Sequence, residues 1–191
     1  DPRAKARDRA VRFIPTPLPG AFVIEPERHE DERGFLARTW CRFEFEAHGL
    51  VTSFVQCNIS FNLKVGTLRG LHYQAPPYSE AKLVRCTRGK AFDVMVDLRR
   101  SSPTRLQWHG VELSADNARM VYIPEDFAHG FQTLEDDTEL FYQMSESHRP
   151  EAARGFRFDD PTLAIAWPLA DPILSPRDRS LPLLAMERIA C

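Results

Sequence analysis

Short runs of β-branched and aromatic residues, separated by turn residues, recur along the middle of the chain. "AKLVRCT" and "AFDVMVDLR" flank "RGK", "HGVELS" and "ARMVYIP" flank "ADN", and "GFQTLE" and "TELFYQMSE" flank "DD". Two such runs around a short turn are typical of a β-hairpin. Hairpins that follow one another in this way predict an all-β antiparallel barrel or sandwich.

The flanking segments add strands and little helix. Strands are expected in "AFVIEP", "GFLARTW" and "TSFVQCNISFN", and a short amphipathic helix is expected in "CRFEFEAHGL", ending at Gly49. The proline-rich stretches at residues 15–19 and 168–182 predict surface arms. Residues 160–187 hold too much proline for a long helix and are expected to wrap the barrel.

Length and composition predict a single domain. At 191 residues and 43% hydrophobic content the chain can bury a full core, so one domain is expected over residues 1–191, with residues 1–15 as a loosely ordered N-terminal arm. A net charge of −2 gives no basic footprint for nucleic acid. No apolar run approaches the roughly 20 residues that a membrane span needs.

The ends and the cysteines favour a cytoplasmic protein. Residues 1–13, "DPRAKARDRAVRF", lack the apolar core of a secretory signal. The cysteines are scattered without metal-like spacing, which favours reduced thiols in a cytosolic protein over a disulfide framework. They are Cys41, Cys57, Cys86 and Cys191.

His72, in "GTLRGLHYQ", lies on a predicted strand whose two faces are both mixed. Alternation of side chains places His72 on one face with Leu68, Gly70 and Gln74, and places Arg69 on the other face. Because neither face is cleanly apolar, His72 is a candidate for three roles. It can be a structural core residue, a metal ligand or a proton-transfer group.

A second histidine, His129 in "IPEDFAHGF", precedes another predicted strand. Two histidine-bearing motifs that face one pocket are similar to the cupin barrel, whose metal-binding members carry HxH, a following Glu and a second-motif His. Here Gln74 stands at the second histidine position, and Glu80 stands alone. His72, His129 and Glu80 make a poor ligand set for a divalent metal, so no metal site is expected.

Cationic side chains gather on the strands predicted to lie beside these histidines. Arg69 and Lys82 join the two imidazoles there. Cations enclosed in a barrel repel one another unless an anion offsets their charge. An anionic ligand is therefore favoured over a purely structural role for the histidines.

Six motifs in order carry a family resemblance. They are "DERGF", "FVQCNIS", "GTLRGLHYQ", "AKLVRC", "IPEDFAHGF" and "DPTLAIAWP", and with them the sequence resembles the dTDP-4-dehydrorhamnose 3,5-epimerase family over roughly residues 20–184. The resemblance implies a cupin-like antiparallel jelly-roll barrel with short flanking helices, usually a homodimer. It also implies a reaction without metal or redox cofactor on a nucleotide-linked 4-keto-6-deoxyhexose. Such an enzyme removes a proton beside the ketone and returns one to the opposite face.

The resemblance also assigns catalytic roles. His72 matches the base, and Asp178 matches the carboxylate that fixes its tautomer, with Asp93 as a second candidate for that partner. Lys82 matches the lysine near the keto oxygen, where an ammonium offsets enolate charge. Tyr142 matches the acid on the face opposite the histidine.

Binding roles follow from the same resemblance. Arg69 matches an arginine that contacts the diphosphate, and Arg33 matches one that reaches in from the partner subunit. Gln56 and Asn58 match positions that hydrogen-bond the nucleotide, and His129 matches a histidine that contacts the sugar.

The sequence departs from the family pattern at a few of these positions. Arg38 and Ala153 stand where glutamates are expected, which leaves the nucleotide base open. Arg177 replaces a lysine and keeps its charge. Ser147 and His148 replace an aromatic pair, so that an aromatic wall of the sugar pocket becomes an imidazole.

Other functions remain open beside a 3,5-epimerase. A mono-epimerase or a sugar ketoisomerase would use the same fold and base. A sugar-nucleotide-binding barrel without turnover is favoured if His72 and Asp178 lie beyond hydrogen-bond reach. A metal cupin oxygenase would bind iron or zinc.

Overall fold

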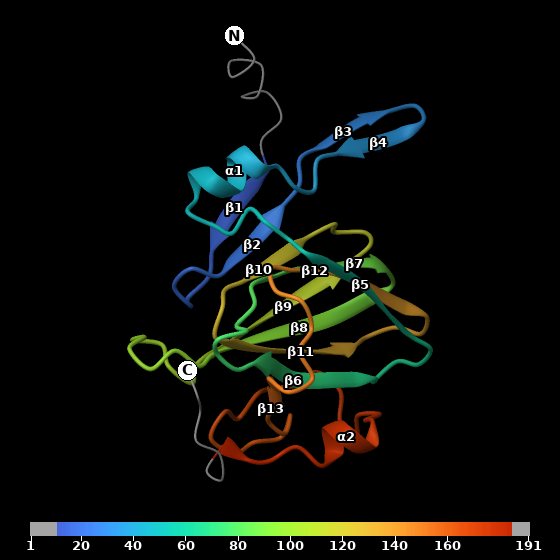
Figure 1. Cartoon of the computed structure of the whole chain (residues 1–191). Coiled ribbons are helices and arrows are strands. Elements are labelled where there is room, and N and C mark those ends of the chain that lie inside the picture. Colours follow the sequence, from blue (N-terminus) through green and yellow to red (C-terminus); the bar gives the residue numbers. More distant parts are fainter. Residues whose placement is uncertain (1–10, 185–191) are drawn as a thin grey trace.

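Two antiparallel β-sheets face each other within residues 11–184, the part of the chain that the computed structural model describes (Figure 1). The six-stranded sheet has the order β1 (Arg12–Pro15), β2 (Phe22–Glu25), β10 (Met120–Ile123), β7 (Lys82–Arg88), β12 (Thr138–Met144) and β5 (Gln56–Asn62). The five-stranded sheet has the order β13 (Ala153–Gly155), β6 (Leu68–Gln74), β11 (Phe127–Thr133), β8 (Lys90–Asp97) and β9 (Trp108–Ser114). Outside them lie the hairpin of β3 (Arg28–Asp31) and β4 (Gly34–Ala37), and the helices α1 (Arg42–Ala47) and α2 (Pro176–Arg179).

The connections between strands define a jelly roll. From β5 to β8, and again from β9 to β13, consecutive strands alternate between the two sheets. Crossing from sheet to sheet in this way is the pattern of a double-sheet jelly roll. The predicted all-β, cupin-like jelly roll with short flanking helices is therefore confirmed.

The three predicted hairpins are wrong, although their strands are present. β7 and β8 belong to different sheets, as do β9 and β10, and β11 and β12. Gly89, at the corner between β7 and β8, has φ +71, and a Cβ there would lie 2.5 Å from Oγ1 of Thr138. A hairpin and a corner between sheets both need two strands and a turn, so local sequence does not separate them.

The main core lies between the two sheets. Val84 and Leu140 project into it from β7 and β12, and Met95 and Phe131 project into it from β8 and β11. A second cluster covers the outer face of the five-stranded sheet and is built from Leu71, Tyr73, Val94, Phe156, Leu163 and Leu184. β8 is consequently buried on both faces, which explains its nearly continuous apolar sequence.

The second cluster depends on the C-terminal segment, which crosses below β6 and β13 in Figure 1. Leu68 N donates a hydrogen bond to Ile173 O (2.9 Å), and Leu184 N donates one to Asp160 Oδ2 (2.7 Å). The prediction that this segment wraps the barrel is confirmed up to residue 184, and residues 185–187 lie outside the described residues.

The N-terminal segment is only in part the predicted arm. Residues 1–10 lie outside the described residues, but Arg12–Pro15 form β1, which pairs with β2. Residues 15–19 are not a surface arm throughout, because Leu18 is 1% exposed and packs into the main core.

The described residues bear on two expectations from the composition, the absence of a membrane-spanning helix and the state of the cysteines. Within residues 11–184, no helix is long and apolar enough to cross a membrane. Cys41, Cys57 and Cys86 carry free thiols there, as the scattered spacing predicted.

Candidate active site

A bulge in β6 brings Arg69 and His72 to the same side of the strand. In the pairing of β6 with β11, His72 lies opposite His129 and Arg69 lies opposite Phe131. Between these two pairs, β6 advances by three residues while β11 advances by two, so β6 contains one extra residue. One extra residue reverses the alternation of side chains beyond it. The prediction that Arg69 and His72 point to opposite faces is therefore wrong, because both line the cavity described below.

Gly70 makes the bulge possible. Its φ is +121, and a Cβ on it would lie 2.7 Å from Cα of Gly130 and 2.8 Å from the carbonyl oxygen of His129. Only a residue without a side chain fits this close approach of two backbones. The bulge thus comes from a glycine whose conformation the strand pattern did not reveal.

His72 and Asp178 form the predicted pair. His72 Nε2 lies 2.6 Å from Asp178 Oδ1, and Gly70 N donates a hydrogen bond to Asp178 Oδ2 at 3.3 Å. Asp178 sits in α2, whose first turn is capped by the Ser175 side chain. Burial by itself would raise the pKa of Asp178, but the hydrogen bond and charge of His72 hold that pKa below its ordinary value. The carboxylate is thus ionised at neutral pH and engages Nε2 of His72, so Nδ1 is the ring nitrogen that this pairing leaves for other contacts.

Asp93, the second candidate for the partner of His72, pairs with the other histidine. Its Oδ2 lies 2.8 Å from His129 Nε2, and both side chains are nearly inaccessible to solvent. The two histidines are cross-strand neighbours, so the site holds two separate imidazole–carboxylate pairs.

Lys82 and Tyr142 face these histidines from the opposite sheet. Lys82 lies on β7 and forms an ion pair with Glu80, with Nζ 2.8 Å from Oε1. Burial raises the pKa of Tyr142 on β12, while the charge of Arg69 and a hydrogen bond with Asn58 partly oppose that rise. The phenol is consequently protonated at neutral pH and able to donate a proton.

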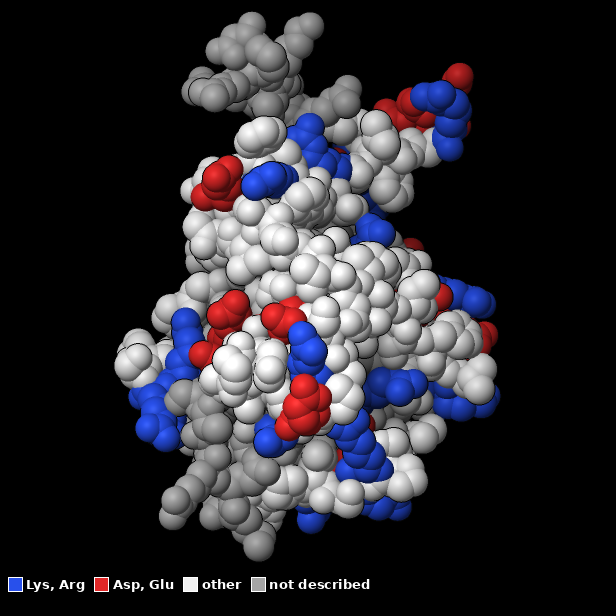
Figure 2. Space-filling model, in the orientation of Figure 1, with Lys and Arg blue, Asp and Glu red and all other residues white. Residues whose placement is uncertain are grey.

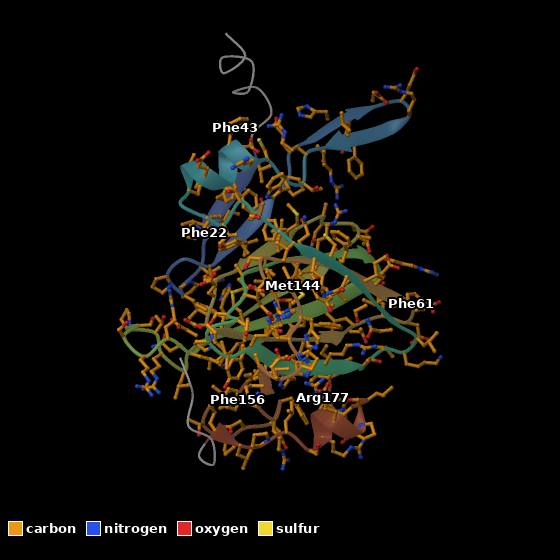
Figure 3. All side chains as sticks on the ribbon, viewed as in Figure 1. Phe22, Phe43, Phe61, Met144, Phe156 and Arg177 are labelled. Atoms are coloured by element: carbon orange, nitrogen blue, oxygen red, sulfur yellow. The ribbon has the colours of Figure 1, made fainter. Side chains whose placement is uncertain are left out.

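Two adjoining cavities of about 400 and 450 Å³ lie between the sheets and share Ile59, His72, Lys82 and Tyr142. The larger continues along Arg69, His129 and Phe131. The smaller continues along Gln56, Asn58, Gln74, Glu80, Met144, His148, Ala153, Arg154 and Arg177. Figure 3 shows Met144 on the upper sheet and Arg177 at α2. Of the predicted site residues, the structure therefore brings together ten around one cleft, either as lining or, for Asp178, behind His72.

Gln74 lines the smaller cavity, although the sequence did not assign it to the site. Its side chain donates to the carbonyl oxygens of Tyr78 (2.9 Å) and Ser147 (3.3 Å) and accepts from Arg149 N (2.6 Å). Gln56 Oε1 accepts from His148 N at 2.9 Å. Two glutamines thus hold residues 147–149 against the cavity. The sequence feature that could have indicated Gln74 is a polar residue at the end of a strand, β6, whose other residues are mostly buried.

Arg33 does not reach this cleft. It lies at the tip of the β3–β4 hairpin, which projects away from the barrel, and its side chain is 84% exposed and paired with Asp31. Figure 2 shows charges of both signs at that tip. Arg38 lies next to the same hairpin and pairs with Glu44 (3.2 Å). Neither arginine lines the two cavities.

Within residues 11–184, no group of three or more His, Cys, Asp or Glu side chains lies close enough together to hold a metal ion. The cleft brings together an imidazole paired with a carboxylate, a lysine and a phenol around a polar cavity.

Comparison with known proteins gives consistent matches over nearly the whole chain. The profile of the family described as dTDP-4-dehydrorhamnose 3,5-epimerase matches residues 15–186. A relative of that name from Shigella flexneri is 46% identical over 169 residues, covering 88% of this chain and 93% of the relative. A relative from Streptomyces niveus named dTDP-4-dehydrorhamnose 3-epimerase is 39% identical over 181 residues, covering 94% and 87%. The crystal structure of the 3,5-epimerase from Bacillus anthracis with TDP and PPi bound has a TM-score of 0.89 and 43% identity, covering 92% of this chain and all of that one.

The jelly-roll fold, the paired histidine and carboxylate, and these matches together identify a cupin-like epimerase. The chain belongs to the dTDP-4-dehydrorhamnose 3,5-epimerase family.

Proposed function

We propose that this enzyme epimerises a nucleotide-diphospho-4-keto-6-deoxyhexose at C3, at C5 or at both carbons. The observation that carries the proposal is the arrangement of His72 and Tyr142 on opposite sheets of one cavity, with Asp178 behind the histidine. Inversion needs a base on one face of the sugar ring and an acid on the other. A ring held between the two sheets meets both.

The steps follow from the residues. His72 removes the proton next to the C4 ketone, and Asp178 stabilises the imidazolium that results. Lys82 offsets the negative charge that develops on the keto oxygen. Tyr142 donates its proton from the other side, which inverts the carbon. Exchange with solvent then removes the proton from His72 and returns one to Tyr142. Each step is a proton transfer, so the proposed reaction requires neither a metal nor a redox cofactor.

The nucleotide half of the substrate is assigned to the polar ends of the cleft. Arg69 is proposed to bind the diphosphate, since guanidinium groups pair well with phosphate oxygens. Gln56, Asn58 and Arg177 are proposed to bind the nucleotide, and His129 the sugar. The TDP and PPi of the Bacillus anthracis relative support a nucleotide-diphosphate ligand.

The experiment that tests this function is incubation with dTDP-4-keto-6-deoxyglucose in D₂O, followed by NMR of the sugar. Deuterium is expected at C3, at C5 or at both. Binding of the nucleotide sugar without any exchange would instead favour a barrel without turnover, and movement of the carbonyl along the ring would favour a ketoisomerase.

A mono-epimerase is the second candidate because of His148. The imidazole lines the cavity, and its backbone is fixed by Gln56. A relative from Streptomyces niveus is named a 3-epimerase. A flat aromatic wall tolerates several ring poses, whereas an imidazole can hydrogen-bond a hydroxyl and favour one pose. One pose presents one C–H to the base more readily than the other.

Exchange at one carbon is therefore expected to be clearly faster than at the other, and His148→Tyr should bring the two rates closer. A preference of about 1.4 kcal/mol for one pose is already a tenfold difference in rate. The measurement is the ratio of deuterium incorporation at C3 and C5 in the wild-type and variant enzymes. Equal rates in the wild type, or a ratio that His148→Tyr leaves unchanged, would contradict this role for His148.

The active unit is proposed to be a homodimer. β5 is an edge strand of the six-stranded sheet, and its Ile59 and Phe61, which border the larger cavity, are 64% and 40% exposed. Leu36, on the projecting hairpin, is 65% exposed. Apolar side chains on an edge strand and on a projecting hairpin favour coverage by another protein surface. A second copy would cover them and would place the hairpin, with Arg33, against the partner's cleft.

Arg33→Ala is accordingly expected to raise KM for the nucleotide sugar several-fold while leaving kcat nearly unchanged. Arg12→Ala is the matched control, because Arg12 is also exposed and paired with an acid but lies on β1. Steady-state kinetics and analytical ultracentrifugation provide the measurements. A fully active monomer, or equal KM values for the two variants, would count against a shared site.

The compartment is proposed to be the cytoplasm. The free thiols of Cys41, Cys57 and Cys86 support a reducing environment.

A further inference from the structure

Glu80 is a buried acid in the cleft that the proposed steps do not use. It lies in the connection between β6 and β7, and the next residue, Ala81, is fixed to the end of β12. Ala81 N donates to Ser145 Oγ (2.8 Å), and Ser145 N donates to Ala81 O (3.0 Å). The backbone that carries Glu80 is therefore attached to the strand that carries Tyr142.

The two carboxylate oxygens of Glu80 differ in their surroundings. Oε1 lies 2.8 Å from Nζ of Lys82, and the side chains of both residues are at least nine-tenths buried. Oε2 is buried and has no hydrogen-bond partner among the described residues. Glu80 lines the smaller cavity together with Lys82 and Tyr142. A buried carboxylate oxygen without a donor is costly, so a donor supplied by a ligand would be bound strongly.

The Glu80–Lys82 pair indicates what kind of ligand would supply that donor. The Lys82 ammonium offers only donors, and a carboxylate paired with it, as Glu80 is, offers only acceptors. The two groups lie side by side, so they match a ligand that carries one acceptor and one donor on neighbouring atoms. An α-hydroxy ketone has this pattern, because its carbonyl oxygen accepts while the hydroxyl on the adjacent carbon donates.

We propose that Glu80 Oε2 accepts a hydrogen bond from the C3 hydroxyl of the sugar while Lys82 donates to the C4 keto oxygen. This assignment rests on the proposed function. It makes Glu80 a specificity-determining residue that selects a sugar with a free hydroxyl next to the ketone. When the C5 proton is lost and the keto oxygen becomes an enolate, C3 is unchanged and its hydroxyl keeps its proton and its contact with Glu80, so the pair holds the ring in place during exchange at C5.

The test compares dTDP-4-keto-6-deoxyglucose with its 3-deoxy analogue. The quantity measured is the preference, that is, the ratio of kcat/KM for solvent deuterium exchange at C5 in the two substrates. Removing the hydroxyl changes the intrinsic acidity of the sugar equally for every variant, so a change in the preference reports on the contact itself. In Glu80→Gln the charge is lost and the volume is kept, and the preference is expected to fall about tenfold, the usual difference for one hydrogen bond to a charged group.

Glu112→Gln is the matched control. Glu112 also pairs with a lysine, Lys90, at 3.6 Å, but it is half-exposed on β9 outside the cavities. The preference of the Glu112→Gln enzyme for the 3-hydroxy substrate should equal that of the wild type.

Failure of the proposed contact with Glu80 and failure of the proposed function give different results. A preference within twofold of the wild type in both Glu80→Gln and Glu80→Ala, even with slower exchange of both substrates, would show a purely structural role for Glu80 and overturn the inference. If Glu80→Ala does not fold, Glu80→Gln alone decides. Absence of exchange in the wild-type enzyme would overturn the proposed function together with this inference.

Discussion

Replacing His72 with asparagine is expected to lower the rate of solvent exchange at the sugar carbons by about 10²- to 10⁴-fold, the usual contribution of a general base. Asparagine keeps a donor for the Asp178 carboxylate, which His72 contacts at 2.6 Å, so the buried acid remains satisfied. It has no nitrogen that can accept a proton near neutral pH. The loss should therefore appear in kcat, measured by NMR of deuterium incorporation.

Binding and folding should change little in the same variant. Calorimetric titration with dTDP is expected to give a Kd within a few-fold of the wild-type value, and the Tm should stay within a few degrees. His109→Asn is the matched control, because His109 lies on β9 outside both cavities and its replacement should leave exchange unchanged. Exchange in His72→Asn within tenfold of the wild-type rate would rule out His72 as the base.

Replacing Gly70 with alanine is expected to cause a large loss of stability. The added Cβ would lie 2.7 Å from Cα of Gly130 at a φ of +121. Backbone strain and forced overpacking together predict a loss of about 4 kcal/mol in the free energy of unfolding. Activity should fall as well, because Gly70 N donates to Asp178 and the bulge aligns Arg69 with His72.

Gly66→Ala separates the clash from the strain. Gly66 also has a positive φ, +81, but an added Cβ would meet nothing within 4 Å. Its expected cost is about 1 kcal/mol, from backbone conformation alone. The free energies of unfolding in urea measure both variants. Equal losses at Gly66 and Gly70 would show that the close approach of β6 and β11 is not what the glycine permits.

The candidate site residues were named by the family resemblance, which rests on six ordered motifs. Among them are His72, Lys82 and Tyr142. The structure brings these three side chains to one cleft, and their roles stay a prediction. For the partner of His72, the resemblance gives Asp178, with Asp93 as a second candidate. Only folding showed that each acid serves a different histidine.

Other contacts within the site could not be predicted from the sequence. The Glu80–Lys82 pair depends on how the connection before β7 packs against β12. The position of residues 147–149 depends on hydrogen bonds to Gln56 and Gln74, which come from two different sheets. These contacts join segments far apart in sequence. Local patterns carry no information about which of many polar side chains will meet.

The sequence by itself determined that the chain is built of short strands and that proline limits helix at its C-terminal end. Both features follow from local conformational preference. The candidate roles of the histidine, the lysine and the tyrosine came instead from the family resemblance that the ordered motifs carry. The tertiary structure decided which sheet each strand joins and that Arg69 and His72 face the same way. A corner between sheets and a hairpin have the same local sequence, and a bulge is stable only where another backbone lies against it. Both choices are made by the burial of apolar faces and by close contact between distant strands, which no local segment contains.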